Sequence, residues 1–183
     1  MDNDASLIIR GELAANERLL WAGQPGRGIA LGPSDIFLIP FTLLWFGFAV
    51  FWESTAVAGG APVFFALWGI PFVLVGLYMV FGRFFVDSWQ RSKMYYGVTS
   101  QRIIIVSGMF SKSVKSLNLR TLSDISMNQK GDGSGTITFG PTSFYGAWMR
   151  AWPTTGAYTS PSFAMIPDVK RVYDTIRTAQ TQA

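Results

Sequence analysis

Two missing residue types limit the chemistry that this sequence can carry. The chain has 183 residues and contains neither cysteine nor histidine. Disulfides are excluded, as are the zinc, haem and iron–sulfur sites that need Cys or His ligands. The commonest general base and the usual serine triad are absent too. Because the eleven acidic residues are scattered, with no pair placed for hydrolysis, we expect no enzyme, no cofactor and no metal site.

Three alternating glycines form the pattern nearest to a phosphate-binding loop. Gly131, Gly133 and Gly135 fit neither GxGxxG nor GxxxxGK[ST]. The segment that follows, Thr136–Phe139, predicts a strand rather than a helix, so no helix N-terminus is offered to a phosphate. We predict a hairpin turn here.

Four basic residues are the candidates for contact with acidic lipid headgroups or an acidic partner. They are Lys112, Lys115, Arg120 and Lys130. Residues 83–183 carry twelve basic and five acidic side chains, whereas residues 1–35 carry three and five. A tethered basic domain is attracted to anionic membranes by about 1 kcal/mol per Lys or Arg near the surface. A solvated basic face without a partner is the alternative. Arg102 is expected to be structural, paired with Asp124.

The segment Gly140–Pro161 gathers aromatic side chains among Gly, Thr, Ser and Pro. Tyr145, Trp148 and Trp152 are the candidates for interfacial contact, because amphipathic aromatics favour the membrane–water boundary. The segment could equally cover the domain's own apolar surface or form an oligomer contact. No stacking-platform motif for RNA is present, so we expect no nucleic-acid partner.

Two long apolar runs predict the elements that position these residues. The first, Ile36–Trp52, would make a helix of about 25 Å, and the second, Pro62–Phe81, holds twenty uncharged residues. Core helices of a soluble protein would show a polar face, which both runs lack. We predict a two-span transmembrane hairpin over residues 36–82. Its turn is Glu53–Ala61, so no acidic residue lies within a span.

Basic residues flank the hairpin on both sides and are missing from its turn. Arg10, Arg18 and Arg27 precede it, and Arg83, Arg91 and Lys93 follow it. The positive-inside rule then places both termini in the cytoplasm. A signal peptide is excluded because five acidic residues precede the first run. We expect a multi-pass protein of the bacterial cytoplasmic membrane.

After a juxtamembrane linker, residues 83–93, short β segments with turn signals predict a β-rich domain over residues 94–180. The expected strands are Met94–Val98, Arg102–Val106, Val114–Leu119, Leu122–Asn128, Thr136–Phe139 and Ser162–Ile166. Asp168–Thr178 carries one apolar stripe and predicts an amphipathic helix, formed by Val169, Val172, Tyr173 and Ile176. The fold class is therefore α+β, an antiparallel sandwich or barrel closed by a helix. Residues 1–35 are expected to be a separate cytoplasmic segment.

The order of these pieces resembles the bacterial pleckstrin-homology (PH) domain. The resemblance is carried by YYGVTSQRIIIVSG, LRTLSDI, GSGTITFG and FAMIPDVKRVYDTI. The upstream ERLLWAGQP, followed by a two-span hairpin, is similar to the membrane-anchored members of that group. The resemblance implies a PH-like fold and a membrane address, and it implies no catalytic activity.

Two functions are compatible with these features. The first is a non-catalytic, membrane-anchored binding or scaffolding module that meets membrane lipids and a protein partner or a second copy. The second is an accessory subunit whose spans pack against a membrane transporter or enzyme.

Overall fold

The computed structural model describes residues 3–26, 28–29, 35–108, 112–141 and 160–182. The described chain divides into two compact units, and each is treated by itself. One unit is the helical hairpin, residues 29–87. The other is a β-rich domain that takes residues from both sides of the hairpin, up to residue 28 and again from residue 88. The fold class is α+β, as the sequence predicts.

The hairpin consists of α2 (Asp35–Ala58) and α3 (Val63–Leu77), and α3 continues through the π-helical turn η1 (Tyr78–Gly82) into α4 (Arg83–Arg91). By length and composition, Asp35–Ala58 and Val63–Arg91 could each cross a membrane. The turn is shorter than predicted, because α2 runs past Trp52 to Ala58. The hydroxyls of Ser54 and Thr55 donate to the Phe51 carbonyl, which lets these polar residues stay helical.

This longer helix corrects the prediction for Glu53, which lies inside α2 and not in the turn. Its carboxylate lies against α3 in the space that a side chain at Gly69 would occupy, since a Cβ there would come within 1.6 Å of Oε2. Seven residues further along α3, the ring of Phe46 packs against Gly76 in the same way, since a Cβ there would come within 2.8 Å of that ring. Two glycines seven residues apart therefore allow the close approach of the helices, although neither α2 nor α3 contains a GxxxG motif.

The domain contains two antiparallel sheets. The first has the strand order β1-β2-β3-β4 and the second the order β5-β6-β7. Their bounds are β1 Leu19–Gly23, β2 Tyr95–Thr99, β3 Arg102–Ser107, β4 Ser113–Asn118, β5 Ile125–Gln129, β6 Gly135–Phe139 and β7 Ser162–Ile166. A 3₁₀ turn, η2 (Leu119–Thr121), separates β4 from β5. Apart from β1, every one of these strands agrees with its predicted range to within three residues at either end.

Aromatic and branched side chains from both sheets form the main core. Phe163 stacks on Tyr96 at 4.5 Å between ring centroids and meets Phe139 edge-on at 5.1 Å. Helix α6 (Val169–Gln182) closes this core with one buried stripe, which confirms the predicted amphipathic helix. The stripe consists of Val169, Val172, Ile176 and Ala179.

The uninterrupted apolar run of β3 has a physical reason. Ile103 and Ile105 belong to the main core, whereas Ile104 and Val106 belong to a second cluster on the other face of the sheet. Helix α1 (Asn3–Arg10) covers that face and contributes Ala5 and Ile9. A strand covered on both faces needs apolar residues at consecutive positions.

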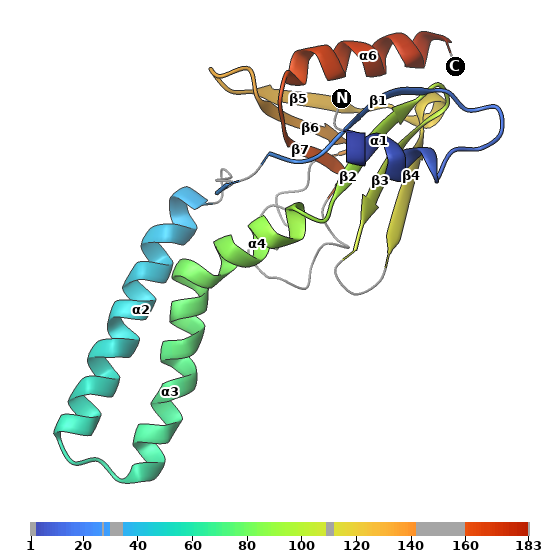
Figure 1. Ribbon diagram of the computed structural model, residues 1–183. Helices are drawn as coiled ribbons and strands as arrows, with labels where there is room; N and C mark the ends of the chain where they lie inside the picture. The colour runs from blue at the N-terminus through green and yellow to red at the C-terminus, as the bar shows by residue number, and fades with distance from the viewer. Residues whose placement is uncertain (1–2, 27, 30–34, 109–111, 142–159, 183) are drawn as a thin grey trace. The chain divides into compact units, whose positions relative to one another are not determined.

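Strand β1 lies in the N-terminal segment, which the sequence predicts to be separate from the domain, and that prediction is wrong. The strand pairs antiparallel with β2, with Gly23 opposite Tyr96, so that β1 and β2 lie side by side in the sheet (Figure 1). The whole hairpin is therefore inserted between two neighbouring strands of one sheet.

Candidate functional site

The connection between β1 and β2 contains the whole helical hairpin. The chain leaves β1 at Gly23 and returns into β2 at Tyr95. Since the two strands are antiparallel neighbours, both ends of the connection lie at the same end of the sheet. A connection of this kind can cross a membrane only an even number of times, because both of its ends belong to one folded domain.

Arg91 ties the outgoing and returning segments together. Its side chain is buried, with 5% of the residue exposed, and it donates to the carbonyls of Gly26 at 3.3 Å and Gly28 at 2.6 Å. The same guanidinium lies 2.8 Å from Sδ of Met165 in β7, and the Gly26 amide donates to the Met165 carbonyl at 2.7 Å. The two ends of the insertion are therefore bound to each other and to the second sheet.

A second pair joins the two ends of the hairpin unit. Asp35 stands at the start of α2 and Arg83 follows η1, and their side chains form an ion pair at 3.0 Å with little exposure. The Arg83 guanidinium also lies over the ring of Phe84, at 4.4 Å from its centroid. The first and last turns of the hairpin are therefore held together by an ion pair.

At the opposite end of β2, a buried carboxylate holds the N-terminal segment to the sheet. Glu17 receives two hydrogen bonds from Arg102, one on each carboxylate oxygen and both at 2.9 Å. The Thr99 hydroxyl donates to it at 2.6 Å and the Ala14 amide at 3.0 Å. The predicted pairing of Arg102 with Asp124 is wrong. Glu17 lies in residues 1–35, which the sequence predicts to be separate from the β-rich domain. For that reason the sequence does not indicate Glu17 as the partner of Arg102.

These bonds decide the ionisation of Glu17. Burial alone would raise its pKa, but the hydrogen bonds from Arg102, the Ala14 amide and Thr99 lower the pKa from an ordinary 4.5 to about 2. The carboxylate in turn raises the pKa of Arg102. The pair is charged throughout the physiological range.

The pH dependence of stability follows from this shift. A carboxyl group with a lowered pKa in the folded state stabilises the fold above its unfolded pKa, and that stabilisation is lost as pH falls. We expect the Glu17 contribution to be complete above pH 4.5 and to disappear between pH 4.5 and about 2. Urea unfolding of the full chain in detergent measures the free energy of unfolding at each pH in this range. That free energy should fall as the pH is lowered, and Glu17→Gln should make the fall less steep. An unchanged slope in the variant would contradict the assignment.

The four predicted basic residues do not form one cluster. Lys112 pairs with Glu12, and Lys115 lies exposed on β4 opposite Ile105. Arg120 is in η2 at the other end of β4, and Lys130 is in the turn after β5 in the second sheet. Their role in lipid or partner contact stays a prediction.

The remaining predicted features are a turn and an aromatic segment. The glycine-rich segment is a hairpin turn, as predicted, with Gly133 at a φ of +81° and its amide bonded to the Lys130 carbonyl. Tyr145, Trp148 and Trp152 lie outside the described residues. Among the described residues, no group of three or more acidic side chains could hold a metal ion.

Comparison with known proteins identifies the family. A model of the bacterial PH domain matches residues 36–180. The chain belongs to the bacterial PH domain family. No curated protein and no solved structure matches it. The matched range of this bacterial PH domain includes the hairpin, whereas β1 and the Glu17 carboxylate lie before it. Membership in this family indicates a binding module, and PH domains commonly bind lipids or proteins.

Proposed function

We propose that this protein is a non-catalytic binding or scaffolding module anchored at the cytoplasmic face of a bacterial inner membrane. The hairpin anchors the chain, and the PH domain meets membrane lipids and a protein partner. Both termini and the domain are cytoplasmic.

The insertion of the hairpin between β1 and β2 is the observation that carries this proposal. Two helices of sufficient length and apolar character lie within a connection that must cross an even number of times. Basic residues gather on both flanks of that connection, and none lies in its turn, residues 59–62. Two spans with a cytoplasmic domain satisfy the connectivity, the composition and the charge distribution together.

Lipid contact of the domain is proposed for exposed basic residues near the connecting segments. Lys130 lies in the β5–β6 turn, and the adjacent start of β6 pairs with the end of β7, next to Met165 and its contacts with Arg91. Lys93, which precedes β2, is also exposed. Tyr145, Trp148 and Trp152 remain proposed interfacial contacts, because their type suits the headgroup region.

One observation favours the second function, an accessory subunit of a membrane complex. Exposed aromatic rings form a continuous row over both helices of the hairpin, with successive centroids 6.3–6.5 Å apart. The row is Phe41, Trp45, Phe72, Trp68 and Phe64. Trp45 lies in the middle of α2, whereas interfacial tryptophans favour the ends of a span. A partner helix would offer such a row more contacts than lipid chains do.

Alkaline carbonate extraction followed by affinity capture in mild detergent tests both functions. The proposed module stays in the membrane pellet and is recovered alone or with copies of itself and non-stoichiometric proteins. Recovery of one polytopic protein in equal amount would favour the accessory subunit. Release of the full chain by carbonate would contradict the anchoring itself.

A further inference from the structure

We infer that three exposed arginines at one end of the PH domain form a docking surface for an acidic polypeptide segment of a cytoplasmic partner. This surface, the arginine pole, consists of Arg18, Arg120 and Arg177. The inference gives the chemical class of the partner that the proposed module binds, and it rests on that proposed function.

The pole is built from three distant segments that hydrogen bonds hold together. Arg18 precedes β1, and its backbone exchanges bonds with Ser100, whose amide donates to the Arg18 carbonyl at 2.9 Å and whose hydroxyl accepts from the Arg18 amide at 3.2 Å. The next residue, Gln101, accepts from the Leu119 amide at 3.0 Å. Arg120 follows directly, and its amide is capped by the Asn118 side chain.

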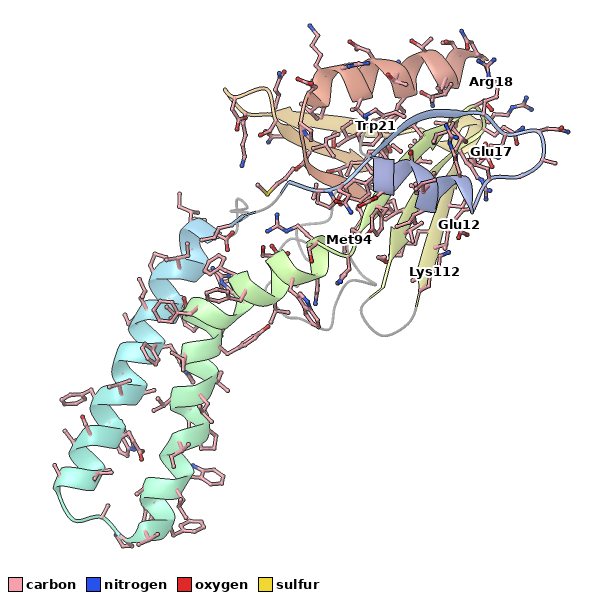
Figure 2. All side chains as sticks on the ribbon, in the orientation of Figure 1. Glu12, Glu17, Arg18, Trp21, Met94 and Lys112 are labelled. Carbon is pink, nitrogen blue, oxygen red and sulfur yellow. The ribbon has the colours of Figure 1, made fainter. Side chains whose placement is uncertain are left out.

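Helix α6 brings the third arginine to the same place. The Gln180 side-chain amide donates to the carbonyls of Leu119 and Leu122, at 3.2 and 2.7 Å. Arg177 donates to the Gln180 side-chain oxygen at 3.1 Å, which places its guanidinium beside the 3₁₀ turn. Leu20, two residues after Arg18, lines one groove with Thr178 and Gln182 of α6, and Figure 2 labels Arg18 at this end of the domain. The three side chains therefore belong to one hydrogen-bonded region.

The charges of the pole are unused within the described part of the chain. Arg83, Arg102 and Lys112 each have an acidic partner. Arg18, Arg120 and Arg177 are exposed, and none of them forms an ion pair with a described acidic side chain. The nearby carboxylate of Glu17 is already saturated by Arg102, Thr99 and the Ala14 amide. Guanidinium groups bind carboxylates through paired hydrogen bonds, so an acidic partner is the ligand that this surface fits.

The pole and the start of the hairpin connection lie at opposite ends of β1 and β2. In the first sheet, Thr99 pairs with Leu19 at the pole, whereas Gly23 and Tyr96 mark the other end, from which the hairpin connection leaves. The pole is thus at the end of β1 and β2 away from the connection. An open groove of about 840 Å³ also lies along α6, with Leu20, Thr178 and Gln182 in its wall. Its charged lining is mixed, Lys170 and Arg171 with Asp168 and Asp174, so the acidic groups of a bound segment are expected at the pole and not in the groove.

Binding of a labelled acidic peptide tests the pole. The full chain in an uncharged detergent is titrated against a fluorescein-labelled peptide of ten glutamates in low salt, and anisotropy is measured. Reversing two charges of the pole, Arg18→Glu with Arg120→Glu, is expected to weaken binding at least about tenfold. The matched control, Arg10→Glu with Lys115→Glu, changes net charge equally on exposed residues outside the pole. It should weaken binding by less than about threefold.

The outcomes separate the pole from simpler explanations. Equal loss in both double variants would mean that only net charge matters, and no loss in either would mean that the peptide binds elsewhere. Both results overturn the proposal, as does tighter binding of a ten-nucleotide single-stranded RNA. Near-ultraviolet circular dichroism of each variant checks its fold. Arg18→Lys with Arg120→Lys keeps both charges but loses the paired hydrogen bonds, so it should weaken binding less than the charge reversal does. Carbonate extraction of the same variants tests membrane anchoring separately. A variant can therefore lose peptide binding and still stay in the membrane pellet, which would leave the proposed anchoring intact.

Discussion

Replacing Glu17 by glutamine is expected to lower the free energy of unfolding of the PH domain by about 3 kcal/mol at neutral pH. The carboxylate accepts four hydrogen bonds in a fully buried position, two of them from Arg102. An amide would turn one acceptor into a donor that faces other donors, and Arg102 would lose its counter-charge. Urea unfolding of the full chain in detergent, followed by near-ultraviolet circular dichroism, measures the change.

A matched variant shows whether the effect comes from burial. Glu12 also pairs with a basic residue, Lys112, but the side chains are 23% and 56% exposed. Glu12→Gln should therefore cost less than about 1 kcal/mol. Combining Glu17→Gln with Arg102→Met should cost clearly less than the two single changes added together, because each removes the same interaction. Equal effects of Glu12→Gln and Glu17→Gln would show that the buried pair has no special role.

The second large effect is expected in the hairpin, where Gly76→Leu should separate α2 from α3. A Cβ at Gly76 already comes within 2.8 Å of the Phe46 ring and 3.1 Å of its Cα, so the backbone of α2 must move. Overpacking of this kind costs about 1–3 kcal/mol. Thermal unfolding of the full chain in detergent, followed by the helical circular dichroism signal, should show a lower transition temperature.

Gly47 provides the control for this change. It lies in α2, and a Cβ there meets nothing within 4 Å. Gly47→Leu should leave the transition unchanged or raise it slightly, because leucine favours helix more than glycine does. A loss of stability in Gly47→Leu as large as that in Gly76→Leu would contradict the tight contact assigned to Gly76.

Local patterns in the sequence are enough to predict most of the fold. Strands such as Arg102–Ser107 and the helix from Val169 have strong periodicity or branched residues, and turns such as that at Gly133 have the residues that positive φ requires. These signals depend only on neighbours in the chain. The helical hairpin is predictable for the same reason, since its long apolar runs are local.

Long-range pairings cannot be predicted in this way. Strand β1 joins β2 across the whole hairpin, and nothing in the five residues Leu19–Gly23 identifies their partner. The pairing of Arg102 with Glu17 depends on that strand, so its prediction fails with it. The charge of Glu53 predicts that this residue lies in the turn. In the structure it lies within α2, because the missing side chain at Gly69 leaves space for its carboxylate between the helices.

The candidate basic residues show the limit for function. Charge counts predict that the domain is basic, but they do not say which basic residues are already paired. Lys112 has Glu12 as a partner, whereas Arg120 joins Arg18 and Arg177 through contacts that cross the domain. Only the folded arrangement separates charges used for stability from charges open to a partner.

Single-cysteine labelling tests the central claim, that the β1–β2 connection crosses the membrane twice. The chain has no cysteine, so each introduced thiol is the only one. Three exposed positions are suitable: Ala15 before β1, Ala58 at the end of α2, and Ser126 in β5. With a membrane-impermeant maleimide on intact spheroplasts, Ala58→Cys should be labelled, and Ala15→Cys and Ser126→Cys should be labelled only after permeabilisation. Labelling of Ala15→Cys or Ser126→Cys in intact spheroplasts, or of Ala58→Cys only after permeabilisation, would contradict the account.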